Sequence, residues 1–295
     1  MSATASDRRS PAAASLRWRL AGGAEIGFPP ALGAGIVNVT SDSFFAGARS
    51  ETPEQAVSDG LRFIADGFDV LDVGAVAARS GPPVPASEEA AKLVPAVEAL
   101  AATGGVPVLA DTFSAAVARA VVAVGAAGIN DISGGRDPAL VDVVAESGCA
   151  YVLMHIEGPP RVDRQISGHS DPLAEMYEWF ARRLSELEAA GVAPEQVALD
   201  PGLDFDLTVD DDIAVLRGLS RLRELGRPLF VALSRKDFLG AIANGSWDSR
   251  GEADDREAET LAATAIAVRE GADMLRLHDR SAIDALRVAD RIARG

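Results

Sequence analysis

The chain has 295 residues, 48% of them of hydrophobic types, and a formal net charge of −16 at pH 7. A single barrel domain runs to about 250 residues, so one domain with a tail fits this length better than two. The acidic surface repels phosphate backbones and anionic lipids, which argues against nucleic acid and membranes as partners. A small anionic substrate remains compatible if the site concentrates the few positive charges.

The single cysteine, Cys149, cannot form an internal disulfide, so we expect a cytoplasmic protein. Residues 1–15 carry no apolar segment of a secretory signal and predict a disordered tail. No run of about 18 uncharged apolar residues indicates a transmembrane helix. The folded domain is expected over residues 16–295.

The first expected element is a short hairpin. Apolar residues alternate with arginines over residues 16–20, and a second short run, residues 24–28, follows Gly22-Gly23. We expect this N-terminal hairpin to cover the bottom of the domain that follows.

From about residue 35 onward, short apolar runs alternate with helical patterns. Each run is bounded by Gly, Pro or Asp, as expected of a buried parallel strand. The runs are residues 35–39, 69–73, 106–110, 128–130, 150–154, 196–199, 228–233 and 273–277. Helical patterns between them include residues 53–66, 87–102, 114–124 and 173–190. These units predict an α/β fold, a closed (β/α)8 TIM barrel, with an open doubly wound sheet as the alternative.

Two connecting segments stand out by composition. Residues 241–255 are rich in Gly, Ser and Asp and are interpreted as a long loop before the last helix. The segment after the fifth strand is interpreted as a solvated loop, with a mobile lid over the site as the alternative. Its charged residues are Glu157, Arg161, Asp163, Arg164 and His169.

Polar side chains follow every apolar run. They are Asn38, Asp72, Asp111, Asn130 with Asp131, His155 after Met154, Asp200, Ser234 with Lys236, and Arg276 with His278. In a barrel of this type all strand carboxyl ends meet on one face, which holds the active site. Any one of these residues is explained as a helix cap or strand end. The set as a whole, with a Lys, an Arg and two His, predicts a site.

The residue types suggest a ligand with two different parts. Asp111, Asn130 and Asp200 offer carboxylate and amide groups that pair with a flat heterocycle, and Lys236 can donate to a ring carbonyl or nitrogen. Arg276 and His278, with the amide of Asn38, could hold an anion such as pyrophosphate. No dinucleotide, Walker or zinc-protease motif and no Cys cluster is present, so those chemistries lack support.

Ordered motifs resemble those of the dihydropteroate synthase family. Residues 35–44, GIVNVTSDSF, resemble the family's GILNVTPDSF. Further similarities are Asp111-Thr112 to VDT, residues 129–135 to INDISGG, 153–155 to LMH, 200–202 to DPG, 234–236 to SRK, 260–262 to TLA and 275–279 to LRVHD. Each motif is weak alone, but the ordered set covers roughly residues 16–293.

The resemblance implies a TIM barrel that joins p-aminobenzoate to 6-hydroxymethyl-7,8-dihydropterin pyrophosphate, assisted by Mg²⁺, in a homodimer. By position, the implied pterin-binding residues are Asp111, Asn130, Met154, Asp200 and Lys236. The implied pyrophosphate-binding residues are Asn38, Arg79, Arg276 and His278, with Asn38 also beside the metal. The implied catalytic residues are Asn38, Asp42, Arg79, Lys236, Arg276 and His278.

Departures from the family pattern cluster around the p-aminobenzoate pocket, which the resemblance places at Phe44, Ala78, Ser80 and Asp237. The family's GGESTRPG is replaced by residues 74–81, GAVAARSG, so Ala78 stands where a threonine hydroxyl is usual. Ser41 replaces a proline, and Asp237 replaces a serine near the substrate carboxylate, where like charges repel. The family's GFGKT becomes residues 204–208, DFDLT.

Three interpretations of this pattern stay open. The chain is an ordinary synthase with divergent loops, a paralogue that uses another amine or moves a methyl group from a folate, or a pterin-binding protein without catalysis. From Ala78 and Asp237 we expect poor use of p-aminobenzoate and insensitivity to sulfonamides, which occupy the same pocket.

Overall fold

The structure is a computed structural model that describes residues 16–39, 52–78, 81–162, 166 and 168–294. Its strands are β1 Leu16–Arg19, β2 Glu25–Phe28, β3 Leu32–Asn38, β4 Val70–Gly74, β5 Val108–Asp111, β6 Gly128–Asp131, β7 Ala150–Met154, β8 Val197–Asp200, β9 Phe230–Ala232 and β10 Met274–Leu277. Its α-helices are α1 Pro53–Ala65, α2 Ala86–Ala102, α3 Ala115–Ala123, α4 Pro138–Ser147, α5 Pro172–Ala189, α6 Val209–Arg217, α7 Leu219–Leu222, α8 Asp237–Asn244, α9 Glu257–Arg269 and α10 Arg280–Arg294. Short 3-10 helices are η1 Ala21–Gly23, η3 Pro194–Gln196, η4 Arg223–Leu225, η5 Trp247–Ser249 and η6 Ala253–Asp255.

Strands β3 to β10 form one parallel eight-stranded sheet in the order β8-β7-β6-β5-β4-β3-β10-β9. A parallel bridge between Leu199 of β8 and Leu229, the residue that precedes β9, joins the two ends of this order. The sheet therefore closes on itself, which confirms the TIM barrel and excludes the open doubly wound alternative.

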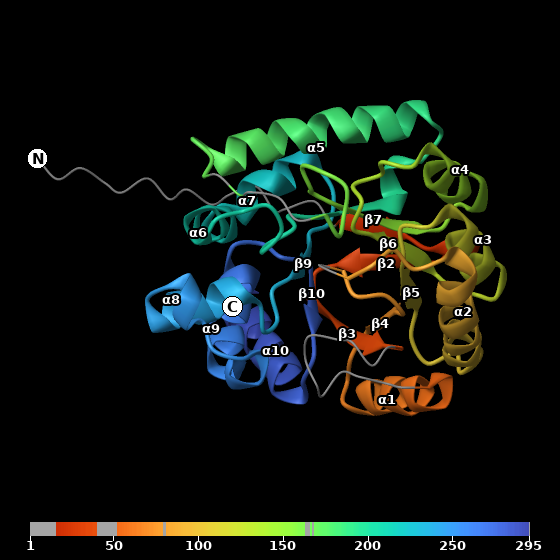
Figure 1. Cartoon of the computed structure of the whole chain (residues 1–295), viewed down its shortest axis with the longest axis horizontal. Helices are drawn as coiled ribbons and strands as arrows, with labels where there is room; N and C mark the ends of the chain where they lie inside the picture. Colours follow the sequence, from red (N-terminus) through yellow and green to blue (C-terminus); the bar gives the residue numbers. More distant parts are fainter. Residues whose placement is uncertain (1–15, 40–51, 79–80, 163–165, 167, 295) are drawn as a thin grey trace, which may run out of the picture.

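The α-helices surround the strands in a ring, with α1 to α5 following one another around one side and α8 to α10 on the other (Figure 1). Local sequence explains where several begin. Thr52, Asp137, Asp171 and Thr208 each accept a backbone hydrogen bond at a helix N-terminus, and proline follows directly in α1, α4 and α5. No helix in the described ranges is both long and apolar enough to cross a lipid bilayer.

Alternation along the strands separates two apolar cores. The outward-facing residues of each strand, such as Leu71, Val73 and Leu275, pack with the helices in one large cluster. Residues near the amino ends of the strands, such as Val70 and Leu109, fill the lower barrel interior. Because side chains alternate with a period of two, the residue two places further along each strand points into the same interior.

The N-terminal hairpin closes the lower end of this interior, as predicted. Strands β1 and β2 pair antiparallel, and Trp18, Leu20 and Phe28 belong to the same buried cluster as the strand amino ends. Trp18 is fully buried, and its indole N–H donates to the carbonyl of Gln196 at 2.7 Å. The hairpin is therefore a plug that leaves the opposite end for ligands.

Two segment predictions were wrong. Residues 241–244 belong to α8, since Phe238, Leu239 and Ala241 give that helix a buried apolar face, and the loop that follows contains η5 and η6. This loop precedes α9, which is not the last helix. The solvated-loop prediction for the β7–α5 segment also fails at Arg161 and His169, whose side chains make structural contacts.

Candidate active site

A layer of polar side chains lies in the barrel interior directly above the apolar plug. Its members are Asp72, Asp111, Asn130, Asp200 and Arg276, which are contributed by β4, β5, β6, β8 and β10. Four of them stand two residues after a member of the lower apolar cluster, namely Val70, Leu109, Ala198 and Met274. Strand alternation therefore brings together polar residues that are far apart in the sequence.

Arg276 is the centre of this layer. Its Nη2 lies 3.0 Å from Asp111 Oδ2, and its Nε contacts Asp72 Oδ2. The amide nitrogen of Asn130 donates to the same Asp72 oxygen at 3.1 Å. A guanidinium held between two carboxylates is fixed in direction, so both carboxylates and the amide keep defined positions.

Two acceptor atoms in the layer lack partners among the described residues. Asp72 Oδ1 and Asn130 Oδ1 are both buried without a hydrogen bond. An unsatisfied buried acceptor costs about 1–3 kcal/mol, so two such atoms in one polar layer indicate a ligand that supplies N–H donors.

Burial raises the pKa of two carboxyl groups in the layer. The pKa of Asp200 rises to about 6, because burial outweighs the opposing charge of Lys236. The pKa of Asp111 rises to about 7, again through burial, with Arg276 opposing. Neighbouring carboxyl groups with perturbed pKa values are typical of a functional site.

Lys236 enters the mouth from the end of β9. The preceding Arg235 has φ 59°, and its side chain is anchored to Asp279 Oδ2 at 2.9 Å. The Lys236 ammonium donates to the carbonyl of Leu203 and lies 4.8 Å from the ring centroid of Phe205. The left-handed turn at the anchored Arg235 thus places the charge of Lys236 near Asp200 of the polar layer.

An apolar surface adjoins the polar layer. Met154, Ile132 and Ile156 form a small buried cluster against which Ala78, Phe113 and Phe205 pack. A polar floor with an apolar side wall suits a flat heterocycle with a polar edge.

The residues expected to bind an anion differ in burial, and some of them lie outside the described residues. His278 is buried, its Nδ1 lies 2.9 Å from Ser234 Oγ, and burial, followed by the charges of Arg276 and Arg235, holds its pKa well below the usual value. The lowered pKa favours the neutral imidazole, which can hydrogen-bond without carrying a charge. Asn38 ends β3 opposite Gly74 and is half-buried. Asp42, Phe44, Arg79 and Ser80 lie outside the described residues.

Asp237 does not present an unpaired carboxylate. Its Oδ1 lies 2.7 Å from Arg256 Nη1 and 3.4 Å from Arg250 Nε. The Arg256 side chain is only 4% exposed, so the pair is largely shielded from water. The expected repulsion between Asp237 and a substrate carboxylate therefore lacks its physical basis.

Two aspartates stand after DPG where the family pattern has glycines. Asp204 and Asp206 adopt φ 70° and φ 56°, a left-handed region that favours glycine. Their carboxylates offset the strain, because Asp204 accepts from the backbone of Asp237 and Phe238, and Asp206 accepts from Glu157 N at 3.1 Å.

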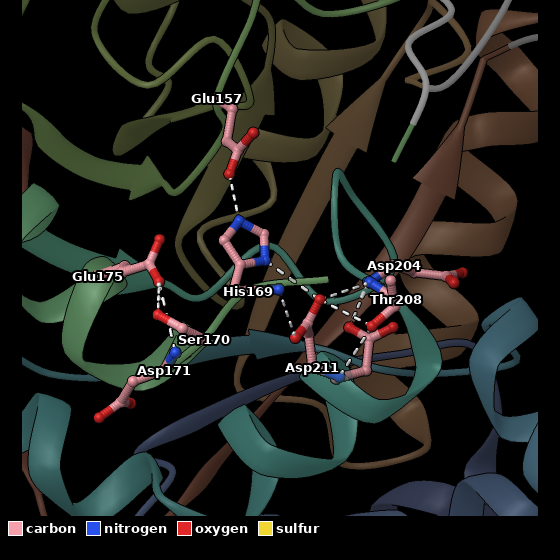
Figure 2. A network of polar contacts seen from close by, with 9 residues as sticks. Glu157, His169, Ser170, Asp171, Glu175, Asp204, Thr208 and Asp211 are labelled. Carbon is pink, nitrogen blue, oxygen red and sulfur yellow. Dashed lines mark hydrogen bonds and ion pairs between the residues drawn. The ribbon is translucent and has the colours of Figure 1, made fainter. Parts of the chain in front are cut away.

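A polar network connects the β7–α5 loop to the β8–α6 loop (Figure 2). His169 stands between the carboxylates of Glu157 and Asp211, with Nε2 2.5 Å from Glu157 Oε1 and Nδ1 3.1 Å from Asp211 Oδ2. Its hydrogen bond to Glu157 is the main cause that raises the pKa of His169. Asp211 also accepts from Thr208, which caps α6. The network holds two loops at the mouth.

Two strand-end residues point away from the interior. Asp131 follows Asn130 and accepts from Ser133 N, Gly135 N and the Tyr151 hydroxyl, so it shapes a loop. His155 follows Met154 and packs edge-on against Trp179. Their position immediately after an inward-facing residue is the signal that separates them from the site.

Asp72 is the one interior residue to which the sequence analysis gave no role, although it was named among the strand ends. Its signal is the same alternation, since Asp72 stands two residues after the buried Val70. A strand that turns from apolar to acidic at an inward position predicts a binding group.

Comparisons with known proteins identify the family of the chain. The profile of the family described as "Pterin binding enzyme" matches residues 34–278. The chain therefore belongs to the family of pterin-binding enzymes. Its enzymatic class within that family is a transferase of the dihydropteroate synthase type.

One relative and two solved structures illustrate the similarity. The chain is 38% identical to dihydropteroate synthase from Mycobacterium leprae, over 86% of this chain and 90% of the relative. It superposes on the Xanthomonas albilineans enzyme with 4-aminobenzoic acid at TM-score 0.84, with 36% identity and 94% and 98% of the two chains covered. The Yersinia pestis enzyme in a sulfonamide drug complex gives TM-score 0.88, 29% identity and coverage of 95% and 100%.

Proposed function

We propose that the chain condenses 6-hydroxymethyl-7,8-dihydropterin pyrophosphate with p-aminobenzoate and releases pyrophosphate. The observation that carries this proposal is the buried layer of acceptors around Arg276, with Asp72 Oδ1 and Asn130 Oδ1 lacking partners. A pterin edge with its amino and ring N–H groups supplies the donors that such a layer needs. The 4-aminobenzoic acid bound by the Xanthomonas albilineans relative supports the second substrate.

The residues act by holding and orienting. Asp200, Asp111 and Asn130 accept from the pterin edge, Lys236 donates to a ring carbonyl or nitrogen, and Met154 packs on the ring face. The arylamine lone pair then attacks the exocyclic methylene carbon while the carbon–oxygen bond to pyrophosphate breaks and its electrons leave with that oxygen. The amine proton goes to solvent, so no strong base is needed.

Pyrophosphate would lie near Asn38, Arg276 and His278, with Arg79 completing the set. Arg276 is 19% exposed even while it pairs with Asp72 and Asp111, so one edge of the guanidinium stays accessible to an anion. His278 would contribute a hydrogen bond from its neutral ring rather than a charge. These contacts stabilise the departing oxygen.

A bound Mg²⁺ belongs to the proposal, with Asn38 beside it. No group of three or more His, Cys, Asp or Glu suited to a metal lies within the described ranges. Mg²⁺ is usually bound through one or two side chains plus substrate phosphates. When bound, the ion would neutralise charge on the leaving group. The proposal also includes a homodimer, which the resemblance implies, and a cytoplasmic location, which is expected from the single cysteine Cys149.

The test is a coupled turnover assay with the pterin pyrophosphate, p-aminobenzoate and Mg²⁺, accompanied by calorimetry with the pterin alone. We expect turnover, and pterin binding without p-aminobenzoate. Pterin binding without turnover would instead support the paralogue with another amine or the non-catalytic protein. Loss of both would contradict the pterin assignment itself.

A further inference from the structure

A tight turn in the β8–α6 loop contacts the side chain of Lys236 at two points. The backbone N–H of Phe205 donates to the carbonyl of Gly202 at 2.9 Å, which closes a four-residue turn around Leu203 and Asp204. The Lys236 ammonium donates to the carbonyl of Leu203 and lies 4.8 Å from the ring centroid of Phe205. Asp204, between these two residues, adopts φ 70°. Its left-handed conformation therefore belongs to the turn that brings a carbonyl and a ring to one ammonium group.

The Asp204 carboxylate caps helix α8, which begins directly after Lys236. Its Oδ2 accepts from the backbone N–H of Asp237 at 2.8 Å, and its Oδ1 accepts from that of Phe238 at 3.2 Å. Lys236 occupies the N-cap position, but its ammonium group has no acceptor with which to cap the helix. Amides at a helix N-terminus favour an anion, so Asp204 supplies from another loop the cap that the local sequence lacks.

The turn is attached to helix α6 as well. The backbone N–H of Asp204 donates to Asp212 Oδ1 at 2.8 Å, in the first turns of that helix. Asp212 is fully buried and Asp204 is only 5% exposed, so these hydrogen bonds are shielded from water. Asp204 therefore joins α6 to the start of α8, and the residues on either side of it contact Lys236.

Asp204 is a departure of this chain from the family pattern. The family's GFGKT has glycine at the positions of residues 204 and 206, and both are aspartate here. Asp206 also has a positive φ, of 56°, but its carboxylate accepts from Glu157 N at 3.1 Å, in the β7–α5 loop. The two aspartates thus bind different neighbours, and the carboxylate of Asp204 is directed at α8.

We propose that Asp204 is a positioning residue that fixes Lys236 for its contact with the pterin ring. It does so by capping α8 and by holding the turn whose carbonyl and ring contact the ammonium. The inference rests on the proposed function for the contact between Lys236 and the ligand, whereas the cap itself is independent of any ligand. Asp204 acts through Lys236 and not on a reacting atom.

The binding test is a double-mutant cycle, measured by calorimetry at pH 8 with 6-hydroxymethyl-7,8-dihydropterin. D204G introduces the family's glycine, which tolerates the positive φ, and removes the cap. It should raise the Kd about fivefold or more. Because Asp204 acts through Lys236, D204G added to K236M should change the Kd by less than about twofold.

Two further variants control for the loss of charge and for the change to glycine. D204N keeps one acceptor oxygen and tolerates the left-handed backbone, so its Kd should lie between those of the unmodified protein and D204G. D206G makes the same aspartate-to-glycine change two residues away, at a side chain that binds the β7–α5 loop. It should leave the Kd within about twofold.

The pKa of Asp200, measured by NMR on the unliganded protein, gives a readout that does not depend on binding. Burial raises this pKa to about 6, and the charges of Lys236 and Arg276 oppose the rise, whereas that of Asp72 adds to it. D204G removes a negative charge, which by itself would lower the pKa of a nearby carboxyl group. A rise in D204G, in the direction that K236M gives, therefore reports a displaced ammonium. The rise should be absent when D204G is added to K236M, and absent in D206G.

Either readout can overturn the inference. It is wrong if D204G weakens pterin binding equally with and without Lys236, or if the pKa of Asp200 does not rise in D204G. If the unmodified protein binds no pterin, the proposed function fails, and the titration of Asp200 still decides whether Asp204 positions Lys236. Circular dichroism checks that each variant is folded. Should D204G not fold, D204N undergoes both tests, with smaller changes expected in the same directions.

Discussion

At the scale of single residues, the site consists of polar and charged groups whose burial lowers the stability of the fold. Asp72, Asp111, Asn130 and Asp200 place three carboxyl groups and an amide in one buried layer, with Arg276 and Lys236 as compensating charges. Two acceptor atoms lack partners in the described part of the chain. Because burying these groups is costly, we expect the layer to bind a ligand and not to stabilise the barrel.

Asp200 permits a direct test of whether a group in this layer lowers the stability of the fold while it contributes to ligand binding. Its folded pKa of about 6 lies above the ordinary value of 3.8, so its contribution to stability is present below pH 3.8 and lost as the pH rises through about 6. The loss approaches about 3 kcal/mol for such a shift. Asp200→Asn should therefore be more stable than the unmodified protein at pH 8 and no more stable at pH 4, as measured by denaturant titration.

The same substitution should weaken pterin binding by about 1–3 kcal/mol, measured by calorimetry at pH 8, because the carboxylate acceptor is lost. In the unmodified protein, pterin affinity should fall as the pH drops through about 6, where Asp200 takes up a proton. Asp137→Asn alters a surface helix cap, where both residues serve equally, and should change neither quantity. Undiminished pterin affinity in Asp200→Asn would refute the assignment of this carboxyl group.

At the scale of elements, loops that depart from the family pattern are held by contacts of their own. Asp204 and Asp206 keep a left-handed backbone in place of glycine, and each carboxylate binds a neighbouring backbone amide. His169 joins the β7–α5 loop to α6 (Figure 2). The loops after β7 and β8 therefore have defined conformations although their sequences depart from the family pattern.

The start of α8 gives a prediction that reverses the one made from the sequence. Asp237→Ser removes the partner of the buried Arg256 and should lower the free energy of unfolding by about 1–3 kcal/mol. It should not raise kcat/KM for p-aminobenzoate, either alone or together with Ala78→Thr. The unmodified protein should be inhibited by a sulfonamide, because the Asp237 carboxylate is paired with Arg256 and does not repel the drug.

Denaturant unfolding and steady-state kinetics check this prediction, with Asp248→Ser in η5 as a surface control. The double variant could instead gain p-aminobenzoate turnover and acquire sulfonamide inhibition that the unmodified protein lacks. That result would support the prediction from the sequence that Ala78 and Asp237 impair the p-aminobenzoate pocket.

At the scale of the whole molecule, the barrel has one end for stability and one for binding. The hairpin β1–β2 fills the amino end with Trp18, Leu20 and Phe28, and the polar layer occupies the carboxyl end. The two ends share the strands but no side chains, so changes at one end should leave the other intact.

Trp18 tests this separation. Trp18→Ala should lower the free energy of unfolding by about 3–5 kcal/mol, since a fully buried large side chain is lost. Trp18→Phe keeps most of the volume but loses the 2.7 Å hydrogen bond to Gln196 and should cost less. The pterin Kd of both variants, measured by calorimetry well below their melting temperatures, should stay within twofold. A Kd that weakens in proportion to the stability loss would show that the two ends are coupled.

Much of the molecule could be predicted from the sequence because its signals are local. The apolar run at residues 150–154 matches β7, and the helical pattern at residues 53–66 matches α1 within one residue. The hairpin followed from alternation over residues 16–20 and from Gly22-Gly23. Asp111, Asn130, Asp200, Lys236 and Arg276 were selected because barrel strands end on one face, and the structure brings them together there.

Tertiary structure alone decided what those side chains contact. Asp237 was expected to repel a substrate because its neighbours in sequence are not its partners in space: Arg256 pairs with it after the chain has passed through α8 and two 3-10 helices. Arg161 was interpreted as solvated for the same reason, since Ala77 and Pro82 approach it from a loop about 80 residues away. Periodicity and capping act over a few residues and are visible in the sequence, whereas charge pairing across loops depends on distances that exist only after the barrel has closed.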